Sequence, residues 1–274
     1  MTRFLLALTC GVFGLAAQPN FEVASVKQNT SADFRSGMGM KTLPGGRVSI
    51  KNFPLLIVIA TAYDLPFQST RLTGGPDWIR AERYDIEATA PEGGLSPSAT
   101  GRERDAVVRK MLQSLLVERF KLVMERETKD QPVYAVVVGK KGVKLTNAGI
   151  DEKECAVDDA PGKVSCHNFR GGQGRGLHSD AASIEDAATF VSNWSDRPVV
   201  DQTGITTLFK FDTLGWVPMR PMPGNGAPTS PEGLDDPLRP SLFGIFEQMG
   251  LKLEARRGPI ESFHIRSVEH PGEQ

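Results

Sequence analysis

The sequence has no excess of either charge and no long apolar run beyond its first 17 residues. Its 32 Lys and Arg residues are balanced by 33 Asp and Glu residues, so the formal net charge is -1. Such a chain has no global positive field to attract nucleic acid, and we expect no nucleic-acid partner. No later stretch is long and apolar enough for a membrane-spanning helix. We therefore expect no transmembrane segment once the first residues are removed.

Several motifs that mark common enzyme classes are also missing. The chain has no G-x-S-x-G elbow, no S-x-x-K, no H-E-x-x-H and no glycine loop followed by a Walker lysine. Catalytic triads are recognised by geometry and not by order in the sequence. These absences therefore argue against the common hydrolases and nucleotide enzymes without excluding an enzyme.

Cysteine is scarce, and the first of the three cysteines lies in an apolar N-terminal segment. Residues 1–17 read MTRFLLALTCGVFGLAA, with a positive charge at Arg3, an apolar run and small residues at the end. This pattern is typical of a secretory signal peptide, and a buried N-terminal helix is the alternative. We predict a signal peptide at 1–17 and an exported protein, either periplasmic or secreted.

Removal of that segment leaves two cysteines, Cys155 and Cys166, around a polar loop. An even pair in an exported chain predicts a disulfide. His167 suggests a metal site as the alternative, but two sulfurs and one imidazole lack a fourth ligand. We predict the disulfide, with neither a metal ion nor an organic cofactor.

The remaining sequence contains a pattern that recurs four times: an amphipathic helix followed by two short strands. The clearest copy is 241–268, where Gly250 can end the helix in a left-handed conformation. Strands are expected at 251–254 and 263–268, around a turn at Arg257-Gly258-Pro259. The apolar positions of its helix are Leu242, Ile245, Phe246 and Met249.

The other three copies follow the same pattern. Their apolar helix positions are Leu55, Leu56, Ile59, Ala60 and Tyr63; Val108, Met111, Leu112, Leu115, Leu116 and Phe120; and Ile184, Ala187, Ala188, Val191 and Trp194. Their expected strands are 21–27, 47–51 and 83–88; 122–127 and 133–138, with a turn ending at Pro132; and 198–201 and 208–216. Residues 134–138 are apolar on both faces, so we expect them in the centre of a sheet.

Side chains suited to capping precede three of these helices. Thr100 with Glu103, and Ser183 with Asp186, have the spacing of a capping box. Asn52 can cap the first helix, because the proline two residues later is tolerated in an opening turn.

Helices that alternate with hairpins predict an α+β fold, with repeated helix–hairpin units and helices on one face of mainly antiparallel sheets. One unit cannot cover its own apolar face, so we expect pairs of units to form two similar halves. These halves are 18–150 and 179–274, separated by an irregular, disulfide-closed insert at 151–178. One continuous sheet is the alternative. Residues 217–237 are rich in Pro and Gly, which predicts a disordered loop.

Two groups of polar residues near the insert are candidates for chemistry. The loop at 171–176, GGQGRG, is able to hold an anion with its backbone N–H groups and with Arg170 and Arg175. A flexible loop is the interpretation that we favour, because no Lys-Ser/Thr follows. His178 and Asp180 are candidates for an acid–base pair, although a surface turn and a helix-opening charge explain them as well.

Two turns carry candidate ligand-binding residues. Trp78 offers an aromatic anchor beside Asp77 and Arg80, although a Gly-Gly-Pro turn and a core-sealing indole explain the same residues. Asp201 is a candidate ligand too, and a turn in which its carboxylate accepts backbone N–H groups is the simpler reading.

Several segments together resemble a known family. They are GGPDWI, RYDIEATAP, MLQSLLVERFKLVMERETKDQPVYAVVV, RPVVDQTGI, FDTLGW and MGLKLEARRGPIESFHIRSVEHP. They resemble a large family of exported proteins of unknown function associated with soil bacteria. Its domain is sometimes attached to a BlaR-type membrane sensor peptidase, which implies an extracytoplasmic sensing or binding role. The family supplies no catalytic residues. The helix–hairpin units also look like the small N-terminal domains of secretins and TonB-dependent receptors, which contact other proteins.

We therefore predict an exported, non-catalytic binding or sensing module. Its ligand groove is expected between the halves, near the insert and two Trp-containing loops. The partner is an unidentified small molecule, peptide or envelope protein. The alternatives are a cell-envelope hydrolase that uses His178 and Asp180, and a scaffold that docks to an envelope protein by strand addition.

Overall fold

A computed structural model describes most of the chain beyond the predicted signal peptide. The described ranges are 18–31, 37–43, 46–67, 69–96, 98–155, 163–217, 219 and 239–272. The predicted signal peptide, and all of the predicted loop at 217–237 except Val217 and Met219, lie outside these ranges. Within them, no helix has the length and apolar character that crossing a bilayer requires.

The first sheet is antiparallel, with the order β1-β5-β3-β2. Its strands are β1 (Val23–Asn29), β2 (Gly39–Leu43), β3 (Arg47–Pro54) and β5 (Arg83–Thr89). Alternate residues of β5, namely Tyr84, Ile86 and Ala88, are buried, as a strand with one wet face requires. Helices α1 (Leu55–Ala62) and α3 (Gly101–Phe120) pack with this sheet in one hydrophobic cluster.

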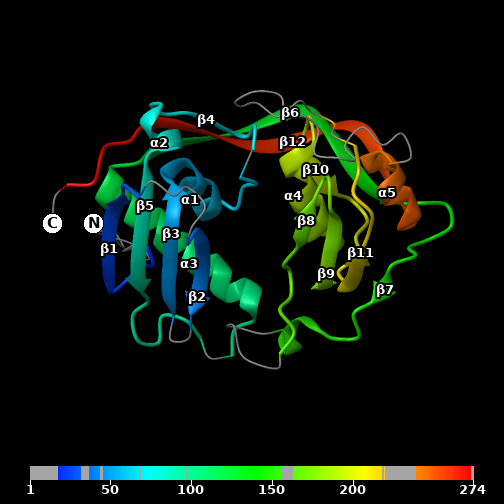
Figure 1. Cartoon of the computed structure of the whole chain (residues 1–274), viewed down its shortest axis with the longest axis horizontal. Helices are drawn as coiled ribbons and strands as arrows, with labels where there is room; N and C mark the ends of the chain where they lie inside the picture. The colour runs from blue at the N-terminus through cyan, green and yellow to red at the C-terminus, as the bar shows by residue number, and fades with distance from the viewer. Residues whose placement is uncertain are drawn as a thin grey trace, which may run out of the picture.

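The second sheet is built on a long ribbon of two strands. Strand β6 (Val123–Val138) pairs with β12 (Leu251–Ser267) in antiparallel register along almost its whole length. Strand β10 (Val199–Asp201) adds in parallel to β6 at one end, and β4 (Leu72–Gly74) adds in parallel to β12 at the other. Figure 1 shows the ribbon arching over the rest of the molecule. Residues 134–136 lie in β6 between β10 and β12, so the central position predicted for 134–138 is confirmed for these three, while Val137 and Val138 pair with β12 and not with β10.

The predicted hairpins of the second, third and fourth units are wrong. The two strands expected around Pro132 are one strand, and so are the two expected around Arg257-Gly258-Pro259. Pro132 lies opposite Arg257 where the ribbon has only two strands, so each strand has a free outer edge. A proline at a free edge costs no ladder hydrogen bond, and the strand continues through it. In the third unit, β10 pairs with β6 and not with 208–216.

The third sheet has the order β7-β11-β9-β8 and is antiparallel. Its strands are β7 (Thr146–Asn147), β8 (Arg170–Gly172), β9 (Gly176–Ala182) and β11 (Phe209–Asp212). The helices associated with it are α4 (Ile184–Val191), the short η2 (Ser192–Trp194) and α5 (Leu242–Gln248). Two further short helices are α2 (Trp78–Ala81) and η1 (Glu152–Glu154).

Two of the three predicted helix caps are confirmed. Thr100 with Glu103, and Ser183 with Asp186, form capping boxes at the starts of α3 and α4. Asn52 is not a cap. It lies in β3 with a φ of 59°, and its side-chain oxygen accepts a 2.9 Å hydrogen bond from Arg83 Nη1. The helix begins at Leu55, three residues after Asn52, and Pro54 occupies the capping position.

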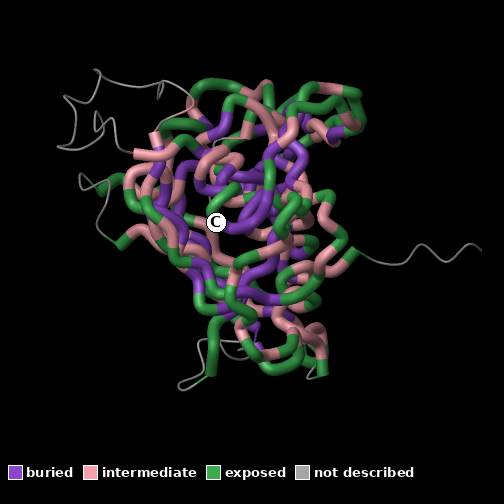
Figure 2. The backbone as a smooth tube through the Cα atoms, turned by 90° about the vertical axis from the view of Figure 1, so that its right-hand side faces the viewer, coloured by how far each residue is buried: buried purple, intermediate pink, exposed green. Residues whose placement is uncertain are grey.

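The fold is α+β, and most buried side chains belong to two hydrophobic cores. The first core combines α1 and α3 with the first sheet, and the second combines α4 and α5 with the third sheet and part of the ribbon. Figure 2 shows the buried backbone gathered in the interior, with exposed turns around it. Strand β12 contributes Leu251 and Leu253 to the second core and Ile265 to the first. Two similar halves are therefore not confirmed, because one strand belongs to both cores.

Candidate functional site

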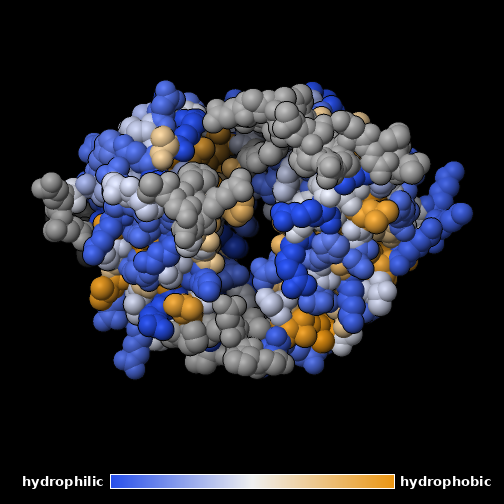
Figure 3. Space-filling model, viewed as in Figure 1, coloured by the Kyte–Doolittle hydropathy of each residue, from blue (hydrophilic) through white to orange (hydrophobic). Residues whose placement is uncertain are grey.

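A cleft of about 680 Å³ lies between the two cores, opposite the ribbon. Its walls come from the loop after α1, from α3, from the segment that follows Cys166, and from α4 with η2. Figure 3 shows the molecule hollowed between the two bodies, with hydrophilic residues along much of the margin. A smaller adjoining pocket of about 410 Å³ shares Asp105 and His167 with the cleft.

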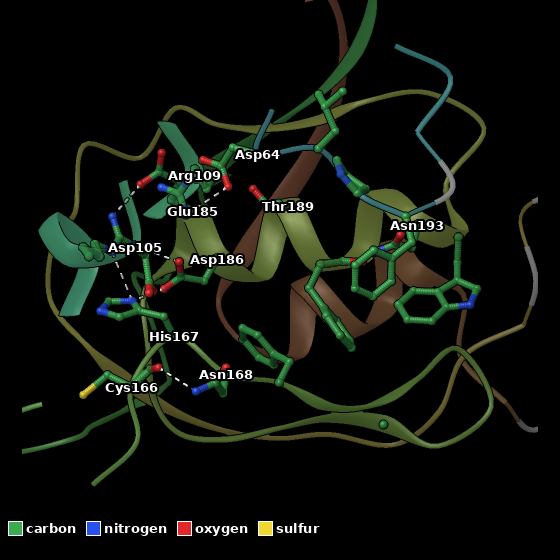
Figure 4. A pocket seen from close by; sticks show the side chains of 18 residues that line it. Asp64, Asp105, Arg109, Cys166, His167, Asn168, Glu185, Asp186, Thr189 and Asn193 are labelled. Carbon is green, nitrogen blue, oxygen red and sulfur yellow. Dashed lines mark hydrogen bonds and ion pairs between the residues drawn. The ribbon is translucent and has the colours of Figure 1, made fainter. Parts of the chain in front are cut away.

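Arg102, in the first turn of α3, joins one wall of the cleft to the other. Its Nη2 lies 2.7 Å from Asp186 Oδ1 and donates to Ser183 Oγ at 3.0 Å, while its Nη1 lies 3.1 Å from Glu185 Oε2. Ser183, Glu185 and Asp186 all belong to the start of α4, so one guanidinium holds the N-terminal turn of the opposite wall. Figure 4 shows the labelled side chains of Glu185 and Asp186 at one end of the cleft, together with those of Asp105, Arg109 and His167.

His167 lies between two carboxylates at this end of the cleft. Its Nδ1 is 2.7 Å from Asp186 Oδ2, and its Nε2 is 3.0 Å from Glu152 Oε2. Arg102 Nε is also 3.2 Å from Nδ1, but a ring nitrogen that donates to Asp186 cannot accept from Arg102. The contact with Asp186 is the shorter of the two, so we assign a proton to Nδ1, which donates it to the carboxylate. Because Nε2 faces a carboxylate as well, the imidazolium form satisfies both contacts.

The surroundings shift the pKa values of this cluster in opposite directions. Burial alone lowers the pKa of His167, but the hydrogen bond and charge of Asp186, with the charge of Glu152, raise it above 6.5 overall. Burial raises the pKa of Asp186, yet bonds from His167 and the Ser183 backbone lower it below 3.8 overall. Burial in the cleft raises the pKa of Asp105, with the charges of Arg109 and His167 opposing this rise.

The backbone around His167 is fixed by two local features. Cys155 and Cys166 form the predicted disulfide, and both are buried. His167 has a φ of 62°, a left-handed conformation that few non-glycine residues adopt. Its backbone N–H donates to the Ala181 carbonyl at 2.8 Å. The disulfide and this bond to β9 together hold the imidazole toward the cleft.

The other end of the cleft is aromatic. Phe169 and Phe190 stack with ring centroids 5.1 Å apart, and Phe190 meets Trp194 edge to face at 5.0 Å. Across from them the loop after α1 carries Phe67, which is 57% exposed. The cleft therefore offers apolar rings at one end and paired charges at the other.

The polar cluster contains a Ser, a His and an Asp, but the hydrogen bonds among them are not those of a nucleophilic triad. Ser183 Oγ donates to Asp186 Oδ2 at 2.7 Å and serves as the cap of α4. In a triad the hydroxyl bonds the imidazole, which removes its proton. Here both nitrogens of His167 are engaged by carboxylates, so His167 is not placed to activate Ser183.

A metal site at this position is not supported by the donor set. Glu152, Cys155 and His167 offer ligand atoms within 4.8 Å of one another. The sulfur of Cys155 is bonded to Cys166, so it cannot supply a thiolate. One carboxylate and one imidazole remain, which is fewer than a structural or catalytic zinc site uses.

His178 and Asp180 both lie in β9, but their side chains contact different partners. His178 Nδ1 is 2.8 Å from Asp212 Oδ1, and its Nε2 is 2.7 Å from the Arg175 carbonyl. Asp180 is 3.7 Å from Arg170. Neither His178 nor Asp180 lines the cleft between the cores.

The other predicted candidates also lie away from the cleft. Trp78 stacks on His270 with centroids 4.0 Å apart, and Arg80 donates to the carbonyls of Gly74 and Pro76. Asp77 occupies the capping position of α2 without a capping hydrogen bond.

Asp201 and Arg175 contact backbone atoms of their own turns. Asp201 Oδ1 accepts from the Thr203 N–H at 2.8 Å, which is the turn contact that competed with a ligand role. Arg175 donates to the Gly171 carbonyl at 3.3 Å.

Sequence reasoning missed the residues that make the cleft. Arg102 and Asp105 are spaced like ordinary surface residues of α3, and nothing in their neighbourhood marks them. Asp186 was recognised only as part of a capping box. His167 was considered only as a metal ligand. Their common signal is proximity to the disulfide and to two helix starts, which the sequence alone does not bring together.

These features define an α+β protein in which two cores, joined by a long two-stranded ribbon, enclose a cleft with one charged and one aromatic end. The chain belongs to the family DUF3738, whose description is protein of unknown function, and the match covers residues 57–268. That range includes both walls of the cleft and the ribbon. No curated protein and no solved structure matches the chain.

Proposed function

We propose that this protein is an exported binding protein whose cleft takes a small molecule with a planar apolar part and a polar part. The observation that carries this proposal is that one cavity between the two cores is lined by aromatic rings at one end and by charged side chains at the other. The volume of about 680 Å³ lies in the range of small-molecule sites, which join apolar walls to a few fixed polar groups.

The polar end favours a ligand that donates hydrogen bonds or carries a positive charge. Arg102, Arg109 and His167 already contact carboxylates, so their charges are compensated within the protein. Asp105 has no ion pair among the described residues and remains accessible in the cleft. An amine or amide group of the ligand at Asp105, with its ring against Phe190, uses both ends of the cavity.

The side chains of His167 and Ser183 are both occupied by contacts within the protein, which agrees with a binding role. The predicted signal peptide at 1–17 and the disulfide between Cys155 and Cys166 support a role outside the cytoplasm, in an oxidising compartment. We propose sensing as the specific kind of binding role. This part of the proposal rests on the resemblance of the sequence to a family of soil bacteria, which implies domains attached to BlaR-type sensor peptidases. Occupancy of the cleft would then be the signal.

The test is a thermal-shift screen of the purified protein with aromatic amines, β-lactams, peptidoglycan fragments and peptides. Ligands that bind only the native state raise the unfolding temperature, and the rise grows with the logarithm of their concentration above Kd. We expect a hit among compounds with both a ring and a hydrogen-bond donor. Failure of every class at millimolar concentration contradicts the proposal.

Tryptophan fluorescence then locates the site. Trp194 lines the cleft, while Trp78 stacks on His270 outside it, so Trp78→Phe is a matched control for Trp194→Phe. We expect a ligand to change the emission of the Trp78→Phe variant and to leave that of Trp194→Phe unchanged. Buried Trp216 remains in both variants, and its ring lies 6.0 Å from that of Trp194, so its own emission is measured separately in a variant that lacks both other tryptophans. The reverse pattern places the ligand elsewhere and overturns the assignment of the cleft.

A further inference from the structure

A second cavity, which shares no residue with the cleft between the cores, lies on the second core. We call it the basic groove, and its volume is about 930 Å³. Its walls are the turn between β8 and β9 and the end of β11 with the segment after it. Residues 239–240, just before α5, and residues 248–249, at the end of α5, also line it. Residues 144–146, around β7, close the remaining side.

The basic groove carries an excess of positive charge. Four cationic residues line it, namely Lys144, Arg175, Lys210 and Arg239. Among the described residues that line the groove, Asp212 is the one carboxylate, and four cations against one carboxylate leave an excess of three positive charges. Asp212 is also already engaged, because its Oδ1 lies 2.8 Å from His178 Nδ1. A single carboxylate does not balance the four cations.

None of the four cations forms an ion pair with a carboxylate in the described part of the chain. Arg175 and Arg239 donate only to the carbonyls of Gly171 and Gly174. Elsewhere on the surface, basic residues are commonly paired. Examples are Lys51 with Glu87, Arg126 with Glu261, Lys129 with Glu127, Arg257 with Asp130 and Arg266 with Glu125. In a chain whose net charge is -1, the groove thus gathers four cations that pair with no described carboxylate.

The backbone of the groove is set by close packing between the turn after β8 and the segment after β11. A Cβ on Gly176 would meet the Thr213 carbonyl, and a Cβ on Gly215 would lie 2.5 Å from the Gly174 carbonyl carbon. The glycines of the turn are thus explained by backbone contact between the hairpin and the segment after β11. Recognition in the groove falls to its side chains and not to a cradle of backbone N–H groups.

We propose that the basic groove binds a phosphate-bearing ligand. A group with at least two negative charges is needed to offset an excess of three, and a phosphate monoester supplies that charge with three acceptor oxygens. Guanidinium groups match phosphate oxygens with paired N–H donors, and lysines add point charges. Leu214, which is 68% exposed beside these cations, offers apolar contact to whatever the phosphate is attached to. A soluble phosphate ester and a phospholipid headgroup share this chemistry.

The test titrates inorganic pyrophosphate into the purified protein. Isothermal titration calorimetry measures the binding at low and at physiological salt. The variant Lys144→Glu/Lys210→Glu reverses two charges of the groove. The matched control is Lys27→Glu/Lys110→Glu, since both lysines are exposed, lie far from the groove in sequence and line neither cavity. Circular dichroism and the unfolding midpoint confirm that each variant is folded.

We expect the groove variant to lose pyrophosphate affinity at least tenfold and the control to change less than twofold, with weaker binding at higher salt. A second arm measures co-sedimentation with vesicles of phosphatidylcholine, with and without phosphatidylglycerol. Binding to the anionic vesicles alone, lost in the groove variant, assigns the same phosphate chemistry to a lipid headgroup. Absence of binding in both arms, or equal loss in the control variant, overturns the proposal. Neither result bears on the cleft, because the two cavities share no residue.

Discussion

Arg102 Nη2 and Asp186 Oδ1 lie 2.7 Å apart, and this contact connects α3 of the first core to α4 of the second. The two helices start on opposite walls of the cleft, and each start is also closed by its own capping box. The ribbon joins the cores on one side of the cleft and Arg102 joins them on the other. The width of the cleft therefore depends on a single guanidinium as well as on the ribbon.

Arg102→Ala is expected to reduce the free energy of unfolding by about 1 to 2 kcal/mol. Hydrogen bonds to charged groups contribute in this range, and the lower end applies because the Arg102 side chain is 41% exposed and solvent screens its charge. Urea denaturation measures the change. Arg170→Ala is the control, because Arg170 is 77% exposed and contacts Asp180 at 3.7 Å. We expect it to change stability by less than about 0.5 kcal/mol, and equal losses in both variants would contradict the role of Arg102.

The contact between His167 and Asp186 is expected to make stability depend on pH. The folded pKa of His167 is raised above 6.5, so its contribution is complete below pH 6.5 and is lost as the pH rises through the folded value. The folded pKa of Asp186 is lowered below 3.8, so its contribution is present above pH 3.8 and is lost as the pH falls through the folded value. Between pH 3.8 and pH 6.5, both His167 and Asp186 therefore contribute to stability.

His167→Asn isolates this effect, because asparagine tolerates the left-handed backbone that His167 adopts. We expect wild type to exceed the variant in unfolding free energy most between pH 4 and 6.5, with a smaller difference at pH 8 to 9. Urea denaturation across this range measures the difference. A constant difference from pH 5 to pH 9 would falsify the assignment of a raised pKa to His167.

Reduction of the disulfide is expected to cost about 3 kcal/mol of stability, since the bridge closes a loop across 11 positions of the sequence. Denaturation with and without dithiothreitol measures the cost, and Cys155→Ala/Cys166→Ala should match the reduced protein. Mass spectrometry of protein from an oxidising compartment is expected to show no free thiol at Cys155 or Cys166. Two free thiols there would reject the bridge.

The ribbon is expected to make both cores unfold together. Leu112 is buried in the first core and Ile245 in the second, and each substitution to Ala leaves a cavity that costs about 2 to 5 kcal/mol. Because β6 and β12 run through both cores, each variant should shift one common transition. Far-UV circular dichroism and tryptophan fluorescence should therefore give the same midpoint. Two separate transitions, with each substitution affecting only one, would show that the cores unfold independently.

Local patterns in the sequence predicted the local structure of this protein. Apolar spacing located the buried faces of α3, α4 and α5, and the capping boxes marked where α3 and α4 begin. The disulfide followed from the count and placement of the cysteines. These features depend on residues close together in the chain, so the side-chain types and their spacing are sufficient to predict them.

Strand pairing and the cleft were decided only by the tertiary structure. A proline or a glycine ends a strand or continues in it according to what lies at its free edge, and Pro132 pairs with Arg257, which lies about 125 residues later in the chain. Arg102, His167 and Asp186 likewise come from separate segments, and none has a neighbour in sequence that signals its partner. Their proximity, and with it the site, exists only once both cores are packed against the shared ribbon.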